Sequence, residues 1–323
     1  MRVSWLIPVR DGAAWLAEAV SSALAQCEDD DEVVVVDDGS SDHPASVLPE
    51  DPRIVLLQQP PRGITAALEA GRARARGELI ARLDADDVAI PGRIVAQKVA
   101  LAADPLLVAV GGQARLVGSL GTGMARYVAW VNALTDLHAS LLVESPLFHP
   151  AVTLRASALT AVGGWREGDF PEDYDLWLRL VAAGGRIAAV EQVVVSIRDR
   201  AERLTRTDPR YRRGAFTDLK MAHLAATRLK VPQRVVVWGA GRGGRRWIRW
   251  LLSEGHRVPV VIDAFCRTER QGVAVVAPER LADVVLDCLL VAVGARGARD
   301  EIRSLLAVIR PQLQEGRDWF AVC

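Results

Sequence analysis

Short apolar runs alternate with amphipathic stretches over the first hundred residues. Runs rich in Val, Ile and Leu predict β-strands at residues 3–9, 32–36, 53–57 and 78–83. Apolar side chains recur at helical spacing after Asp11, which we expect to be the N-cap, and residues 65–76 predict a second helix. Such alternation is typical of βαβ units with right-handed crossovers, so the fold class is α/β with a mostly parallel sheet flanked by helices.

A second organised stretch covers residues 148–185. Pro171 suits the first turn of a helix, an apolar stripe follows, and Gly184 is a natural end. Glu172 and Asp173 then lie at the positive end of the helix dipole, which by itself explains two acidic residues there. Residues 196–230 are rich in basic side chains, and their pattern predicts a partly helical segment. The simplest explanation of these basic side chains is a solvent-exposed face.

A new unit begins near residue 234. A strand is followed by the spacing Gly239-x-Gly241-x-x-Gly244, then by a helix and a second strand that ends at Asp263. This order matches the dinucleotide-binding fingerprint, so the unit either binds NAD(P) as a second nucleotide site or keeps the architecture as a docking module. We therefore predict an α/β domain at 1–200, a basic helical linker at 201–230 and a small Rossmann-like α/β domain at 231–323.

The composition of the chain indicates which partners and which location to expect. The chain has 323 residues, with 40 Lys plus Arg and 40 Asp plus Glu, so no global charge favours binding to nucleic acid. No apolar run reaches the ~20 residues of a membrane span, so no transmembrane segment is expected, although peripheral membrane contact stays open. Four scattered cysteines without a CxxC pair argue against a zinc site and for a reducing, cytoplasmic location.

Three of the predicted strands end in polar residues. The endings contain Arg10, the pair Asp37 and Asp38, and the triplet Asp84, Asp86 and Asp87. Ligands of open parallel sheets bind beyond the carboxyl ends of the strands, so these endings are expected to converge on one site. For any single ending, helix capping or solvation is an equally good explanation. Three carboxylates in four residues repel one another, and a bound cation would relieve that repulsion.

Six segments, in order across residues 1–200, are similar to those of one known family: VSWLIPVRDG, EVVVVDDGSSD, GELIARLDADD, SPLFHPAVTLR, VGGW and EDYDLWLRL. Together they resemble the family-2 glycosyltransferases of the inverting GT-A type. The resemblance implies a metal-dependent enzyme that moves a sugar from a nucleotide-sugar donor, with a UDP-sugar preferred, to a hydroxyl acceptor in glycan assembly.

The resemblance also implies roles for the donor side of the site. Asp37 and Asp38 would contact the base and ribose, and Pro8 and Arg10 would line the nucleotide pocket. Arg198 would meet the diphosphate by charge. Arg10 stands where the family often has an aromatic residue, but a guanidinium also stacks on flat rings.

For the metal and the chemistry, the resemblance assigns Asp84 and Asp86 to the DxD element, with Asp86 the usual ligand of Mn²⁺ or Mg²⁺. Asp173 is the expected catalytic base and Glu172 the second candidate. Physical chemistry agrees, because hard cations take carboxylate and phosphate oxygens and a helix N-terminus favours an ionised carboxylate. His149 lies beside a proline and is ranked as structural.

Two further departures from the family join that of Arg10. Leu68 and Glu69 stand where an Arg-Asn pair is common, and Arg198 and Arg200 frame an Arg-x-Arg where Arg-x-His is common. Arg10 and Glu69 leave open, as one alternative, a scaffold whose transferase site has decayed. A nucleotidyltransferase would share the sheet and the metal but not need Asp173, and an NAD(P)-binding oxidoreductase or sensor would work through the C-terminal unit.

Overall fold

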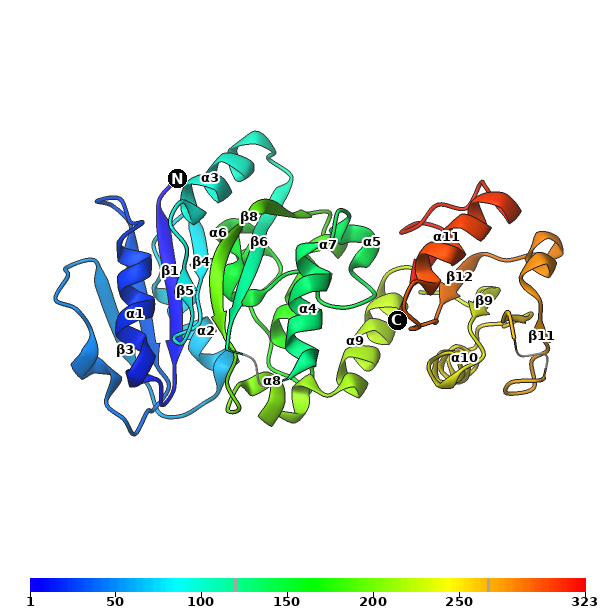
Figure 1. Ribbon diagram of the computed structural model, residues 1–323, viewed down its shortest axis with the longest axis horizontal. Coiled ribbons are helices and arrows are strands. Elements are labelled where there is room, and N and C mark those ends of the chain that lie inside the picture. Colours follow the sequence, from blue (N-terminus) through cyan, green and yellow to red (C-terminus); the bar gives the residue numbers. More distant parts are fainter. Residues whose placement is uncertain (119–120, 266–267) are drawn as a thin grey trace. The chain divides into compact units, whose positions relative to one another are not determined.

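The computed structural model describes residues 1–118, 121–265 and 268–323, so Cys266 lies outside the described residues (Figure 1). The chain forms two compact units. Unit 1 comprises Met1–Thr135 with Pro146–Ala215, and unit 2 comprises Asp136–Ser145 with Phe216–Cys323. The domain boundaries predicted at residues 200 and 230 remain a prediction.

Unit 1 is built on an eight-stranded sheet of order β3-β2-β1-β4-β7-β6-β8-β5. Its strands are β1 Val3–Val9, β2 Glu32–Asp37, β3 Ile54–Gln58, β4 Leu79–Arg82, β5 Val88–Ala89, β6 Leu107–Val117, β7 Thr153–Arg155 and β8 Arg186–Arg198. The first four pair in parallel, and β7 is antiparallel to β4 and β6. The predicted α/β class and the four N-terminal strands are confirmed, and the sheet as a whole is mixed.

The two faces of the parallel half follow from strand alternation. Alternate residues of β1, such as Trp5 and Ile7, share one core with Leu16 of helix α1 (Ala13–Leu24). Leu6 points to the other face, where a Cβ added to Gly71 of helix α2 (Ile64–Arg74) would lie 2.1 Å from it. Both faces of the central strands are therefore covered, which is why β1 and β2 read as continuous apolar runs.

The helices of unit 1 surround this sheet (Figure 1). They are α1 Ala13–Leu24, α2 Ile64–Arg74, α3 Arg93–Ala103, α4 Thr122–Asn132, α6 Ala156–Ala161, α7 Glu172–Ala182 and α8 Leu204–Thr207, with 3₁₀ turns at Pro44–Val47, His149–Ala151 and Pro209–Tyr211. Helix α9, Arg213–Ala226, begins in unit 1 and continues into unit 2.

The predicted N-cap of the first helix is wrong. Gly12 caps α1, and Asp11 has a left-handed φ of 50°. Its carboxylate instead accepts hydrogen bonds from the backbone N–H and the hydroxyl of Ser41, at 2.7 and 2.9 Å. Asp tolerates this conformation because its short side chain bonds locally, and here it ties together the loops that follow β1 and β2.

A buried arginine fixes the backbone around the end of β4. Arg93 is 1% exposed and donates hydrogen bonds to the carbonyls of Pro150 and Arg82, both at 2.7 Å. Its guanidinium lies 4.9 Å from the ring centroid of Trp5. Burial lowers the pKa of Arg93 to about 9. The carbonyl bonds join the strand that precedes Asp84 to the turn that carries His149.

Unit 2 contains a parallel five-stranded sheet of order β11-β10-β9-β12-β13. The strands are β9 Val235–Trp238, β10 Val261–Ile262, β11 Val275–Val276, β12 Cys288–Val291 and β13 Trp319–Ala321; the helices include α5 Leu137–Ser140, α10 Arg242–Ser253 and α11 Ala298–Ile309, with a 3₁₀ turn at Pro278–Asp283. Counted within the unit, the order is 3-2-1-4-5.

Lys220 is buried and donates to the carbonyl of Val143 at 2.7 Å, which anchors the 136–145 segment to α9.

Candidate functional site

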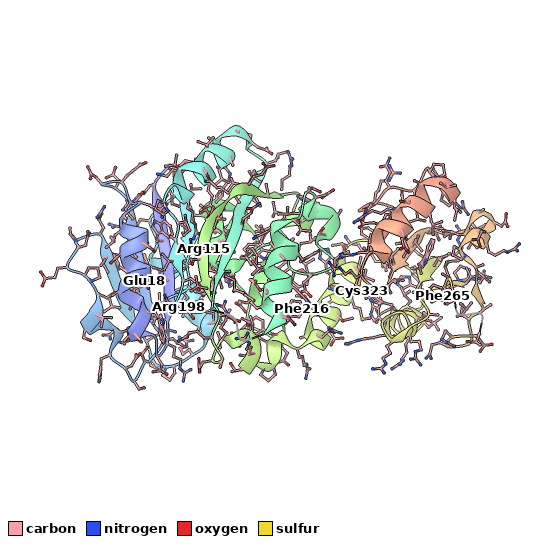
Figure 2. The ribbon with its side chains drawn as sticks, viewed as in Figure 1. Glu18, Arg115, Arg198, Phe216, Phe265 and Cys323 are labelled. Atoms are coloured by element: carbon pink, nitrogen blue, oxygen red, sulfur yellow. The ribbon has the colours of Figure 1, made fainter. Side chains whose placement is uncertain are left out.

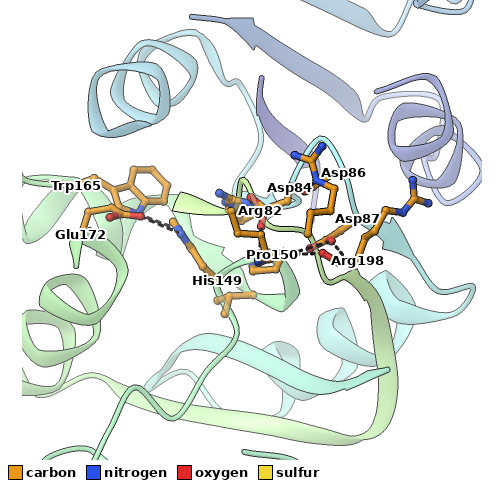
Figure 3. A network of polar contacts seen from close by, with 12 residues as sticks. Arg82, Asp84, Asp86, Asp87, His149, Pro150, Trp165, Glu172 and Arg198 are labelled. Carbon is orange, nitrogen blue, oxygen red and sulfur yellow. Dashed lines mark hydrogen bonds and ion pairs between the residues drawn. The ribbon is translucent and has the colours of Figure 1, made fainter. Parts of the chain in front are cut away.

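The acidic triplet after β4 converges as the sequence predicts. One carboxylate oxygen from each of Asp84, Asp86 and Asp87 lies within 4.8 Å of the other two. The apolar strand places these residues at the carboxyl end of the central parallel strands, and Figure 3 shows the three side chains gathered there. This geometry brings three anionic oxygens into the volume that one metal ion occupies.

Three arginines balance this charge. Arg82 forms an ion pair with Asp84. Arg200 Nε lies 2.9 Å from Asp86 Oδ2, and Arg203 lies 3.7 Å from Asp84. The arginines come from β4 and from the chain that follows β8, so segments far apart in sequence meet at the cluster.

The residues fit a hard divalent cation. Burial, followed by the charge of Asp84, raises the pKa of Asp86 and of Asp87. Burial also acts to raise the pKa of Asp84, but the charges of Arg82 and Arg203 outweigh it, so the pKa of Asp84 is lowered. Asp87 Oδ2 is buried, and no described residue hydrogen-bonds it. An all-oxygen donor set with an unused buried oxygen is the chemistry that Mg²⁺ and Mn²⁺ prefer.

A second polar network surrounds the start of α7. The Tyr211 hydroxyl donates to Glu172 Oε2 at 2.7 Å, and His149 Nδ1 lies 3.7 Å from Glu172 Oε1. The Trp165 indole N–H donates to His149 Nε2 at 3.2 Å, so Nδ1 of the neutral imidazole carries the proton that faces Glu172 (Figure 3). Burial, then the charge of Arg82, lowers the pKa of His149 and keeps this ring neutral.

Taken alone, a histidine beside a proline is most simply structural, which is why His149 is not among the predicted site residues. The signal that could have found its role was the joint occurrence of the FHP, VGGW and EDYD segments. His149, Trp165 and Glu172 come from those three segments and form one chain of contacts.

Asp173 differs from expectation in its charge. From the sequence, the helix N-terminus is expected to keep this carboxylate ionised. Instead, burial and then the charge of Glu172 raise the pKa of Asp173 to about 8. Burial also raises the pKa of Glu172, but the hydrogen bonds from His149 and Tyr211 outweigh it and hold that pKa below its ordinary value. Desolvation and a neighbouring carboxylate therefore dominate over the dipole at Asp173.

The acidic pair that ends β2 is engaged by the protein itself. Asp38 accepts hydrogen bonds from the backbone N–H groups of Arg62 and Gly63, both at 2.8 Å. Asp37 Oδ1 accepts from the backbone N–H of Ser40 at 2.9 Å. Both carboxylates thus shape the loops at this edge of the sheet, and their contact with a nucleotide stays a prediction.

The remaining predicted donor contacts lie on different elements. Pro8 is buried within β1 and Arg10 is exposed just beyond it. The backbone N–H of Arg198 donates to Asp87 Oδ1 at 2.9 Å, but its guanidinium donates to Glu18 at 2.9 Å. Arg198 and Glu18 line a pocket with Arg115, which Figure 2 labels on neighbouring elements. The structure therefore joins the Arg198 backbone, but not its side chain, to the acidic triplet.

Glu69, one of the departures from the family pattern, has a structural role. It forms an ion pair with Arg72 at 2.6 Å and accepts a hydrogen bond from the backbone N–H of Trp165 at 2.7 Å. A side chain on helix α2 therefore holds the loop whose indole contacts His149. This departure supports the site rather than removing a part of it.

The glycines of unit 2 have a structural explanation. A Cβ on Gly244 would lie 1.7 Å from the carbonyl oxygen of Gly239, so helix α10 can pack on this loop only with glycine there. Asp263 Oδ2 accepts a hydrogen bond from the backbone N–H of Ala240 at 2.8 Å, and Gly241 is the N-cap of α10. Asp263 thus fastens the loop, and the NAD(P) prediction gains no support from the described residues.

Comparison with known proteins shows which family the N-terminal part of the chain is similar to. Residues 4–133 match the family described as Glycosyl transferase family 2. Among curated relatives, the chain is 26% identical to the amylovoran biosynthesis glycosyltransferase AmsE of Erwinia amylovora over 147 residues, which cover 46% of the chain and 54% of that protein.

Another relative matches a longer part of the chain. The putative glycosyltransferase EpsE of Bacillus subtilis is 26% identical over 240 residues, covering 72% of the chain and 84% of that protein. The chain thus spans about half the length of the Erwinia relative and most of the Bacillus one. Within residues 1–118, 121–265 and 268–323, no helix combines the length and the apolar character that a membrane crossing needs.

Solved structures share the fold. S. aureus TarS 1-349 in complex with UDP-GlcNAc aligns with a TM-score of 0.55 and 15% identity over 71% of this chain and 68% of that one. The mannosyltransferase PcManGT from Pyrobaculum calidifontis, in complex with GDP-Man and Mn²⁺, aligns with a TM-score of 0.50 and 21% identity over 69% and 61% of the two chains. At these identities the likeness establishes only that the chain shares the GT-A fold.

Proposed function

We propose that this protein is a metal-dependent, inverting glycosyltransferase that moves a sugar from a nucleotide-sugar donor to a hydroxyl acceptor in glycan biosynthesis. The observation that carries the proposal is the convergence of Asp84, Asp86 and Asp87 at the carboxyl edge of the sheet, with one buried oxygen unused. Two proteins of the same fold carry a sugar nucleotide, one of them together with Mn²⁺. We take a UDP-sugar as the first donor to test.

In this proposal Asp86 and Asp84 would hold Mn²⁺ or Mg²⁺. The cation supplies charge neutralisation for the departing nucleoside diphosphate. Three carboxylates against three arginines leave the cluster close to neutral, so a dication and a diphosphate can enter together without a large excess of either charge.

Asp173 would accept the proton of the acceptor hydroxyl at a carboxylate oxygen. A base works best when its pKa lies near the working pH, and a pKa of about 8 satisfies that condition. Glu172 would orient and tune the base, because Tyr211 and His149 hold Glu172 ionised beside it. Attack from the face opposite the leaving diphosphate would invert the anomeric configuration.

The experiment is a panel of UDP- and GDP-sugars, assayed for release of nucleoside diphosphate with and without Mn²⁺ or Mg²⁺. Asp86→Ala should abolish turnover and metal-enhanced donor binding, whereas Asp173→Asn should keep donor binding and lose transfer. Asp30→Asn, at an exposed carboxylate, is the matched control and should behave as the wild type.

Release of pyrophosphate in place of nucleoside diphosphate would make the protein a nucleotidyltransferase. Near-wild-type transfer by Asp173→Asn would remove Asp173 from the role of base.

We also infer that unit 2 is Rossmann-like, because a parallel sheet of order 3-2-1-4-5 is the doubly wound pattern. Fluorescence titration with NADH and NADPH tests whether this architecture binds a dinucleotide. A saturable signal that Asp263→Ala removes would support a second nucleotide site, and a flat titration would leave unit 2 as a structural or docking module.

A further inference from the structure

The chain that follows β8, residues 199–212, contacts the acidic triplet through its arginines. We call it the arginine segment. Arg200 Nε lies 2.9 Å from Asp86 Oδ2, and both side chains are largely buried, at 22% and 15% exposed. Arg203 lies 3.8 Å from Asp87 and donates to the carbonyl of Arg198 at 3.0 Å. The carboxylates proposed as metal ligands therefore already have cationic partners within the chain.

Arg200 and a metal ion would both bind the carboxylate of Asp86. Asp86 has two carboxylate oxygens, and Oδ2 faces the guanidinium of Arg200. A dication on this carboxylate would stand within a few ångströms of that guanidinium, and like charges so close repel strongly in a largely buried site. Binding of one of the two cations should therefore weaken binding of the other.

The surroundings of Arg200 allow it to move without losing all support. Its guanidinium lies 4.3 Å from the ring centroid of Trp15 on helix α1, and that of Arg198 lies 5.7 Å from the same ring. Stacking on an aromatic face is a contact that a guanidinium keeps while it changes hydrogen-bond partner. Trp15 thus serves as a platform on which Arg200 can leave Asp86.

A neighbouring group points to where an anion would bind. Arg203 Nε is buried, and no residue in the described ranges accepts a hydrogen bond from it. A buried guanidinium N–H without an acceptor is costly, and a phosphate oxygen would satisfy it. The arginine segment therefore offers cationic donors to a diphosphate beside the carboxylates that would hold the cation.

We propose that Arg200 is a built-in counter-ion that competes with the divalent cation for Asp86 and, once displaced, turns to the diphosphate of the donor. The second half of this statement rests on the proposed function. The consequence is cooperative binding of the cation and the diphosphate. The cation alone binds weakly, and it binds well together with a diphosphate, because the diphosphate gives the displaced arginine a new partner.

The test uses Mn²⁺ alone as the probe, with its binding to the full chain measured by electron paramagnetic resonance without any donor. Arg200→Gln should bind Mn²⁺ at least about fivefold more tightly than the wild type, because it removes a partly buried competing cation. Arg200→Lys keeps the charge and should bind Mn²⁺ close to the wild-type affinity. Arg186→Gln removes an exposed arginine of the same unit, which pairs with Asp104, and should leave Mn²⁺ affinity unchanged.

Adding UDP completes the test. UDP should increase Mn²⁺ affinity more in the wild type than in Arg200→Gln, since only the wild type has the displaced guanidinium to offer. Circular dichroism confirms that each variant is folded, and Asp86→Ala in both backgrounds assigns the ion to the cluster.

Equal or weaker Mn²⁺ binding by Arg200→Gln overturns the competition, while metal-dependent release of nucleoside diphosphate by the wild type would leave the proposed function standing. If Asp86→Ala changes Mn²⁺ binding in neither background, the cluster is not the metal site, and the competition and the metal dependence of the proposed function fail together.

Discussion

Replacing Asp173 by Asn should change how the stability of unit 1 depends on pH. The folded protein raises the pKa of this carboxyl from 3.8 to about 8, first through burial and then through the charge of Glu172. Between those two pH values the folded chain holds a proton that the unfolded chain has released. The stabilisation that the neutral carboxyl provides is therefore lost as pH rises from about 4 to about 8.

The magnitude follows from linkage. Each pH unit within this window changes the free energy of unfolding by about 1.4 kcal/mol. The loss of stability between pH 6 and pH 8 is therefore about 2 kcal/mol at most. This value is an upper bound because Asp173 is only partly buried and solvent screens part of the interaction. The amide of Asp173→Asn is neutral throughout. The stability of the variant relative to the wild type should therefore increase by up to about 2 kcal/mol over this range.

The assay is urea unfolding of the full chain in EDTA at several pH values from 6 to 8.5, with the transition of unit 1 assigned by hydrogen exchange. Glu191→Gln, at an exposed carboxyl on β8, is the matched control and should follow the wild type at every pH. A constant difference between Asp173→Asn and the wild type across this range would refute the reasoning, because Asp173 would then titrate alike in the folded and unfolded chains.

Three further predictions concern packing and catalysis. Arg93→Ala should destabilise unit 1 by about 3 kcal/mol or more in urea unfolding, because it leaves buried carbonyls without a donor; a loss under 1 kcal/mol would contradict the role of Arg93. Gly244→Ala should lower the melting temperature of unit 2 sharply by circular dichroism, whereas Gly241→Ala should be near neutral, because among the described residues only its own chain neighbours lie within 4 Å of the added Cβ. Tyr211→Phe, which removes the hydrogen bond to Glu172, should lower kcat roughly tenfold with KM little changed, and a change confined to KM would place Tyr211 in donor binding instead.

The fold could be read from the sequence where burial dictates residue type. Strands β1 and β2 are buried on both faces and read as apolar runs, so their positions were predictable to within a residue or so. The convergence of Asp84, Asp86 and Asp87 was predictable for the same reason, because the carboxyl ends of parallel strands share one edge.

Other features depend on contacts between residues far apart in sequence. The bond from Tyr211 to Glu172 joins positions 39 residues apart, and the bond from Trp165 to Glu69 joins positions 96 apart. No local pattern specifies such pairs. The pKa of Asp173 differs from the expected one for a related reason, since the position at a helix N-terminus can be read from sequence whereas burial is a property of the folded chain.

The most direct test of the account is the anomalous scattering of manganese in crystals grown with Mn²⁺ and a nucleoside diphosphate. We expect a manganese peak coordinated by a carboxylate oxygen of Asp86, with Arg200 withdrawn from that side chain. Diffraction showing the diphosphate bound, no manganese at the acidic triplet and Arg200 still paired with Asp86 would contradict it.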